Sequence, residues 1–281
     1  MGEDALDNEA EYNNRRRVPD YAAYAARWGA ASAAYRQSAA GARLDEPYGP
    51  GERNRYDLFP AGLPKAPLVV YIHGGYWQRG DRKDYSFLAR PFNAAGMDVA
   101  LPSYSLCPAV SVMEIVAEMR SCLAAIWKAT GKHPVVTGHS AGGHLAAAML
   151  ATDWGRVAGA PSDLVRAGVP ISGIFELEPL VPTTINDLVK LDATSARAAS
   201  PLLWPPPPAG RALVAAVGGD ESAEFLRQSR DLAAAWGKAG VEGTCLEVPG
   251  ANHFSVVDAL ADPGSALFGH VARLAGRAAS G

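Results

Sequence analysis

The chain has 281 residues, 48% of them hydrophobic, which suits one large α/β domain, and we expect residues 1–281 to form a single domain because no linker-like segment interrupts them. Its net charge of −3 provides no electrostatic basis for binding nucleic acid. The acidic, polar N-terminus lacks the features of a signal peptide, and no apolar run is long enough to span a bilayer, so we expect no membrane partner.

The three cysteines, Cys107, Cys122 and Cys245, show neither paired nor metal-type spacing. This spacing indicates reduced thiols in a cytoplasmic protein. We therefore expect a cytoplasmic protein that acts on a small molecule. The oligomeric state stays open, a homodimer included.

Residues 1–60 are polar, and one segment among them has a regular pattern. Its aromatic residues recur at helical intervals, and the pattern ends at Gly41; they are Tyr21, Tyr24, Trp28 and Tyr35. We expect this helix to pack on the domain and the rest of residues 1–60 to be irregular.

From residue 66 onward, short apolar and β-branched runs alternate with helical patterns. The strand-like runs are 66–73, 97–104, 133–140, 168–175, 211–219 and the more clearly alternating 243–250. The helical patterns are 110–130, 144–152 and 224–240. Such alternation predicts an α/β fold, with a mostly parallel central sheet and helices on both faces.

Residues 176–208 break this alternation. The segment is loop-rich and ends in four consecutive prolines, 205–208, which cannot sit in a central strand. We expect a small, loop-rich cap over the sheet that walls a pocket, or else a plain surface connection.

The strongest local signal for chemistry is Gly138-His139-Ser140-Ala141-Gly142, a G-x-S-x-G motif. It stands between a strand pattern and a helical pattern, the context in which this motif forms a nucleophile elbow. The glycines let neighbouring backbone pass close to the strained serine. We therefore predict that Ser140 is a catalytic nucleophile.

The stretch His73-Gly74-Gly75-Tyr76-Trp77 follows the first predicted buried strand. A serine hydrolase needs backbone N–H groups that stabilise an oxyanion, and glycines allow a close approach. We predict an oxyanion hole formed by Gly74, Gly75 and Ala141. Tyr76 and Trp77 either flank an aromatic substrate or pack in the core.

The general base is expected after the elbow in chain order. His253 lies in a Gly/Asn turn after the last strand, whereas His270 falls in a predicted C-terminal helix, so we predict His253 as the base. His73, His139 and His144 lack metal-ligand spacing. We expect them to support the glycine loops by hydrogen bonds, and we expect no metal and no other cofactor.

Three carboxylates compete for the role of triad acid. Asp220, Glu221 and Glu224 follow the run 211–219, between the nucleophile and the base in chain order. Glu224 falls in the first turn of the next helix, where a negative charge is favourable in any case. Successive side chains that leave a strand point in different directions, so the pattern leaves either Asp220 or Glu221 to face the histidine.

Several motifs together resemble the kynurenine formamidase (arylformamidase) family of α/β-hydrolases. They are HGGYW (73–77), LPSYSLCP (101–108), GHSAGGHL (138–145), ESAEFLRQS (221–229) and NHF (252–254), with the segment 48–59. The resemblance extends over nearly the whole chain from about Tyr12. It implies the α/β-hydrolase fold, no cofactor or metal, and hydrolysis of N-formyl-L-kynurenine to kynurenine and formate, a reaction of tryptophan catabolism.

The resemblance also implies an identity for the acid. Family members carry a carboxylate directly before the S-x-E-F block, and that position is Glu221 here. The animal enzymes have aspartate at this position, so the chain departs from their pattern. The implied triad is Ser140, Glu221 and His253.

Two other functions stay open on the sequence. A carboxylesterase that acts on small aryl or alkyl esters would use the same triad, because amine and alcohol leaving groups both suit it. A non-catalytic receptor with the hydrolase fold would usually lack a triad member, whereas this chain has all three.

Overall fold

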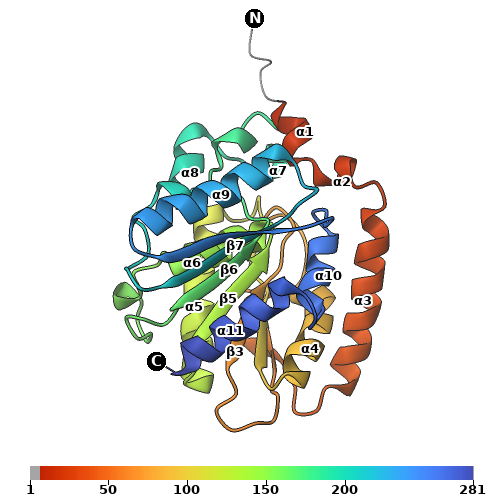
Figure 1. Ribbon diagram of the computed structural model, residues 1–281, viewed down its shortest axis with the longest axis vertical. Coiled ribbons are helices and arrows are strands. Elements are labelled where there is room, and N and C mark those ends of the chain that lie inside the picture. The colour runs from red at the N-terminus through yellow and green to blue at the C-terminus, as the bar shows by residue number, and fades with distance from the viewer. Residues whose placement is uncertain (1–6, 281) are drawn as a thin grey trace, which may run out of the picture.

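The computed structural model describes residues 7–280, which form an eight-stranded sheet with helices on both faces (Figure 1). The strand order is β1-β2-β4-β3-β5-β6-β7-β8, parallel from β4 to β8, with β1 and β2 antiparallel at one edge. The strands are β1 (Arg43–Pro47), β2 (Arg55–Phe59), β3 (Leu68–Ile72), β4 (Asp98–Pro102), β5 (Pro134–His139), β6 (Ala167–Ile171), β7 (Ala212–Gly218) and β8 (Glu242–Val248). The predicted mostly parallel α/β sheet is confirmed.

The connections between the strands are mainly helical. The α-helices are α1 (Asn8–Tyr12), α2 (Asn14–Arg17), α3 (Tyr21–Ser38), α4 (Ala89–Ala94), α5 (Val112–Thr130), α6 (Ala141–Leu150), α7 (Asn186–Val189), α8 (Ala193–Ala198), α9 (Ala223–Lys238), α10 (Ser255–Ala261) and α11 (Ala266–Ser280). Short 3₁₀ segments are η1 (Arg82–Leu88), η2 (Trp154–Arg156), η3 (Glu178–Leu180) and η4 (Pro201–Leu203). The sequence patterns did not predict η1 or α4.

The central strands are buried on both faces, which explains their continuous apolar character. All five residues of β3 are buried, and their side chains alternate between two core clusters. Leu68, Val70 and Ile72 join the cluster formed with α5, α6 and α9. Val69 and Tyr71 join the cluster on the other face, which includes residues of α3, α4, α10 and α11.

The expectation that residues 1–60 are irregular apart from one helix is wrong. Besides α3, this region forms α1, α2 and the antiparallel strands β1 and β2. The pattern concealed β2 because Asp57, a fully buried carboxylate, interrupts its apolar residues. Asp57 is stabilised by ion pairs with Arg36 and Arg82, which come from other elements.

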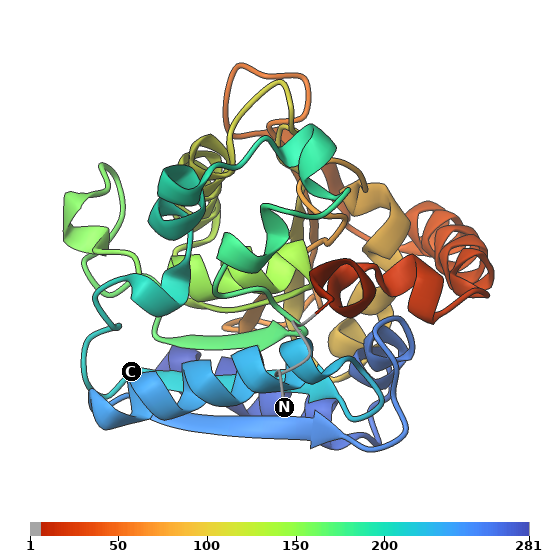
Figure 2. The same ribbon diagram turned by 90° about the horizontal axis from the view of Figure 1, so that it is seen from above.

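Two segments that are far apart in the chain meet at one end of the sheet. Figure 1 shows α1 and α2 at the end toward which the arrows of β5–β7 point, and α7 and α8 lie at the same end. Figure 2, viewed from above, shows α1 and α2 beside the arrowheads of the strands, and Glu9 in α1 accepts a hydrogen bond from Thr184 of the other segment. The segment 176–208 contains η3, α7, α8 and η4 and no strand. This is the end of the sheet at which α/β proteins place their ligand sites.

Candidate active site

Ser140 stands on a sharp turn between β5 and α6. Its φ of 58° and ψ of −120° are angles that residues with a side chain rarely adopt. Gly142 makes the turn sterically feasible, because a Cβ there would lie 2.0 Å from the carbonyl oxygen of Ile72. Ser140 borders a cavity at the carboxyl end of the sheet.

A buried hydrogen bond joins His253 to Glu221. His253 Nδ1 lies 2.6 Å from Glu221 Oε2, and both side chains are at most 5% exposed. Because a carboxylate oxygen accepts, Nδ1 carries the hydrogen, and Nε2 is the ring nitrogen available as an acceptor. His253 borders the same cavity as Ser140.

The structure brings Glu221, and not Asp220, to the histidine. Asp220 is exposed, whereas Glu221 Oε1 accepts hydrogen bonds from the Gly218 N–H at 2.7 Å and from Ser172 Oγ. Glu224 instead bonds to Arg227 and to Tyr12. Of the three competing acids, only Glu221 contacts His253.

Ser172 is a site residue that the sequence reasoning missed. It follows β6, the neighbour of β5 and β7 in the sheet, and has a φ of 48°. Its hydroxyl donates to Glu221 and so restricts the orientation of that carboxylate. A polar residue at the carboxyl end of a central parallel strand was the signal available in the sequence.

Gly74, Gly75 and Ala141 lie around Ser140. A Cβ at Gly74 would lie 2.7 Å from the His139 carbonyl oxygen and 3.1 Å from Ser140 Cβ, so this glycine lies directly against the elbow. Gly74 and Gly75 line the cavity. Ala141 is the first residue of α6, so its N–H has no partner within the helix and stands at the positive end of the helix dipole.

Tyr76 and Trp77 occupy a strained turn but point to different places. Both have positive φ, 51° and 56°, in a turn closed by the hydrogen bond from Gln78 N to Gly75 O. Tyr76 lines the cavity, as a substrate-flanking residue would. Trp77 is fully buried and does not line the cavity; its Nε1 donates to His144 Nδ1. The expectation that Trp77 contacts substrate is therefore corrected: it packs in the core.

Three buried histidines surround these loops. His73 Nδ1 lies 2.8 Å from the carbonyl oxygen of Gly74, and His144 Nε2 lies 2.7 Å from that of Ala199. Burial lowers the pKa of each of these two histidines to about 4, so both stay neutral. The His139 ring lies 4.5 Å from that of His253; burial, and then the proximity of His253, lower the pKa of His139 well below its usual range.

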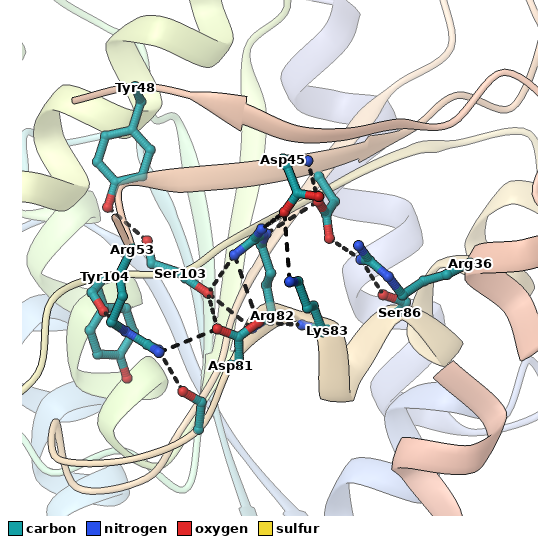
Figure 3. A network of polar contacts seen from close by, with 12 residues as sticks. Arg36, Asp45, Tyr48, Arg53, Asp81, Arg82, Lys83, Ser86, Ser103 and Tyr104 are labelled. Carbon is teal, nitrogen blue, oxygen red and sulfur yellow. Dashed lines mark hydrogen bonds and ion pairs between the residues drawn. The ribbon is translucent and has the colours of Figure 1, made fainter. Parts of the chain in front are cut away.

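A polar network holds the loop between His73 and Arg82, and Figure 3 shows the part of this network around Arg53, Asp81 and Arg82. Tyr104 donates its hydroxyl hydrogen to the His73 carbonyl, and Arg53 donates to the carbonyls of Tyr104 and Gly80. Arg82 also donates to the hydroxyl of Ser103, while Arg53 pairs with Asp81. The loop is therefore held at the His73 end by a tyrosine hydroxyl and at the Gly80 end by charge-assisted hydrogen bonds of Arg53.

The cavity has a volume of about 530 Å³, within the range of small-molecule sites. Its wall includes five aromatic side chains. Tyr21 and Trp28 come from α3, Tyr76 from the glycine loop, Tyr85 from η1 and Phe254 from the turn after His253. Asn13, Asn14 and Arg15 add polar groups from the N-terminal segment, and Thr184 and Ile185 come from the segment 176–208. Among these, the sequence reasoning assigned only Tyr76 to the site.

In the described part of the chain, residues 7–280, no three His, Cys, Asp or Glu side chains are grouped so as to hold a metal ion. None of the helices described is both long and apolar enough to cross a membrane.

Comparison with known proteins places this geometry in a family. Residues 69–256 match the family model described as alpha/beta hydrolase fold. Kynurenine formamidase from Danio rerio is 31% identical over 229 residues, 78% of this chain and 77% of the relative, and that of Drosophila melanogaster is 28% identical over 224 residues, 75% and 74%. The solved structure of a proposed thioesterase from Silicibacter sp. tm1040 is 36% identical, with a TM-score of 0.85 over 95% of this chain and 99% of that one.

The sheet, the elbow at Ser140 and the matched family model define an enzyme of the α/β-hydrolase class. The similarity to the Danio rerio enzyme extends well beyond the matched model, over more than three quarters of both chains. The chain belongs to the kynurenine formamidase family.

Proposed function

We propose that this protein hydrolyses the formyl amide of an arylamine, with N-formyl-L-kynurenine as substrate and kynurenine and formate as products. The observation that carries the proposal is the buried 2.6 Å hydrogen bond between His253 and Glu221, beside Ser140 in an aromatic-lined cavity. The relatives named kynurenine formamidase support the choice of substrate.

In the first half of the reaction, Ser140 Oγ attacks the formyl carbon while His253 Nε2 accepts the hydroxyl proton. Glu221 keeps the hydrogen on Nδ1 and stabilises the imidazolium that forms. The Ser172 hydroxyl and the Gly218 N–H hold Glu221 in place. Because His139 stays neutral, it adds no positive charge beside that imidazolium.

The carbonyl oxygen becomes an oxyanion, to which the N–H groups of Gly75 and Ala141, with Gly74, donate hydrogen bonds. When the tetrahedral intermediate collapses, the C–N bond breaks and His253 gives its proton to the leaving amine. Water, deprotonated by His253, then attacks the formyl-serine ester. Formate leaves, and Ser140 regains its proton.

The cavity wall supports an aromatic leaving group. Tyr76 follows the oxyanion glycines directly, and Tyr21, Tyr85 and Phe254 line the same space. Aromatic side chains pair with an aryl ring in stacked or edge-to-face geometry. We assign Tyr76 to substrate binding for this reason.

The cysteines support a cytoplasmic setting for this reaction, which would belong to tryptophan catabolism. Cys107, Cys122 and Cys245 are all free. Unpaired thiols fit a reducing compartment.

A second candidate is hydrolysis of small aryl or alkyl esters. It is favoured by the 36% identity to the proposed thioesterase, because a thioester and an oxygen ester present the same acyl carbon to the serine. Turnover of N-formylkynurenine against short and long p-nitrophenyl esters separates the two. If only esters react, the formamidase proposal is wrong and the esterase proposal stands.

The Ser140→Ala variant tests the nucleophile. We expect it to lose labelling by a fluorophosphonate probe and at least about 10⁴-fold in kcat, because triad members act as a unit. Ser121→Ala, which removes an exposed serine hydroxyl on α5, is the matched control and should label like the wild type. Wild-type protein that never labels would instead favour a non-catalytic receptor.

A further inference from the structure

Two arginines line the cavity that contains Ser140. Arg15 comes from α2 in the N-terminal segment, and Arg79 comes from the loop just after the oxyanion turn. Among the residues that the structure describes, the cavity wall contains no other arginine and one carboxylate, Asp84. Neither arginine contributes to the chemistry proposed above, so their presence needs a separate explanation.

Neither guanidinium has a counter-ion within residues 7–280. Arg15 lies over the ring of Tyr21, 4.6 Å from its centroid, and Arg79 makes a 3.3 Å hydrogen bond to the neutral Gln78 side chain. Other arginines of the protein do have carboxylate partners; Arg27, Arg36 and Arg82 are examples. The cavity therefore presents positive charge that the described residues leave uncompensated.

The two charges are also close enough to affect each other. Burial, and then the charge of Arg15, lower the pKa of Arg79. Guanidinium groups carry a positive charge at neutral pH. Two neighbouring cations without a partner form a favourable site for an anion, because the anion relieves their repulsion and accepts their hydrogen bonds.

Arg79 lies against the glycine turn next to Ser140, so its charge is close to the reacting centre. A Cβ at Gly75 would lie 2.3 Å from the Arg79 carbonyl oxygen and 2.9 Å from Arg79 Cγ, so the Arg79 stem packs on the oxyanion turn. An anion held by Arg79 would thus belong to a molecule whose acyl group reaches Ser140. A formyl group has no room for a further substituent, so the anion has to be on the amine side.

We propose that Arg15 and Arg79 form an anion subsite that binds a carboxylate on the leaving group of the substrate. This inference rests on the proposed function in one respect: the arylamine that leaves would be the side chain of an amino acid, whose own carboxylate is the anion. The subsite makes the enzyme select aryl amides whose tail carries a carboxylate over aryl amides whose tail lacks one. Arg15 and Arg79 come from two segments that a hydrogen bond from Asn14 to Tyr76, 62 residues further along the chain, joins to each other.

The test compares N-formylkynurenine with N-formylkynuramine, which keeps the aryl ketone and the amine but lacks the carboxylate. The measured quantity is the ratio of kcat/KM for the acidic substrate to kcat/KM for its analogue. We expect Arg15→Ala and Arg79→Ala each to lower this ratio about tenfold, since each removes a charge-assisted contact. Arg79→Lys should lower the ratio less than Arg79→Ala does, because lysine retains the positive charge but not the guanidinium fork.

Arg17→Ala is the matched control, because it removes an exposed arginine from the same short helix without changing the cavity wall. Its ratio should equal that of the wild type. An unchanged ratio in both Arg15→Ala and Arg79→Ala would overturn the subsite, as would a wild-type ratio near one. Because Arg15 lies on a different element from Arg79, a folding defect in one variant leaves the other decisive.

A second pair of substrates separates this inference from the proposed function. If the wild type hydrolyses neither formyl amide, the formamidase proposal fails. The subsite is then judged on the acetate esters of 2-nitrophenol and of 4-hydroxy-3-nitrobenzoate, which differ by one carboxylate on the leaving group. A preference for the acidic ester that falls in both arginine variants supports the subsite, and equal rates for the two esters overturn it.

Discussion

Three hydrogen-bond donors surround the carboxylate of Glu221. Ser172 and the Gly218 N–H bond to Oε1, and His253 bonds to Oε2, all in buried surroundings. A buried carboxylate is stable only where such donors satisfy it, and the same donors determine its direction. At the scale of single residues, the proposed triad therefore depends on a serine and a backbone amide that hold Glu221 in place.

Substitutions at these positions rank their contributions. Glu221→Gln should lower kcat about 10³- to 10⁴-fold, because the amide no longer stabilises the imidazolium or selects the tautomer. Ser172→Ala should lower kcat only about tenfold, since one hydrogen bond of the carboxylate is lost. Steady-state kinetics with one substrate measures both effects.

Asp220→Asn is the control for the acid, because it changes the neighbouring carboxylate, which is exposed. Its kcat should stay within about twofold of the wild type. A loss confined to Asp220→Asn, with Glu221→Gln active, would contradict the assignment of the acid.

At the scale of elements, buried and exposed hydrogen bonds join the N-terminal segment to the end of the sheet where the cavity lies. The Tyr12 hydroxyl donates to Glu224 at 2.7 Å and accepts from Gln228 at 2.6 Å, both on α9. Glu9 accepts from the backbone N–H and the hydroxyl of Thr184. These contacts explain how a short, polar segment forms a stable wall of the cavity.

The Tyr12→Phe variant tests this attachment. It keeps the buried ring but leaves the polar groups of Glu224 and Gln228 short of a partner, so the free energy of unfolding should fall by about 1–3 kcal/mol. Denaturant unfolding measures the change. Tyr24→Phe is the matched control, because that half-buried hydroxyl accepts only a 3.4 Å hydrogen bond from Asn252; equal losses in the two variants would contradict the role given to Tyr12.

At the scale of the whole molecule, the buried neutral histidines connect stability to pH. Burial lowers the pKa of His73 and His144 from 6.5 to about 4. Between these values the unfolded chain binds protons that the folded chain does not bind. The free energy of unfolding therefore falls as pH drops from about 6.5 toward 4, by up to about 1.4 kcal/mol per pH unit for each histidine.

His144→Gln should make this pH dependence shallower. Glutamine can still donate to the carbonyl of Ala199 but does not titrate. Chemical unfolding of the wild type and the variant at pH 7.5, 6 and 5 gives the two slopes. Parallel slopes in this range would show that His144 binds its proton equally in the folded and unfolded chains.

The central elements could be predicted from the sequence because their signals are local. The run of β3 is apolar throughout, and α5 shows its buried side chains at helical spacing. The strand β2, which lies between β1 and β4, could not be predicted in this way. Its buried Asp57 is stabilised by arginines from α3 and η1, so only the assembled fold makes a charge at that position acceptable.

By itself, the sequence determined the chemistry-bearing motifs, because the elbow around Ser140 and the glycine loop depend on neighbours within a few residues. Only the tertiary structure decided that Trp77 packs in the core and that Arg15 lines the same cavity as Ser140. It also decided between the adjacent acids, since only Glu221 points toward His253. These outcomes depend on side-chain directions and on contacts between segments far apart in the chain, which no local pattern records.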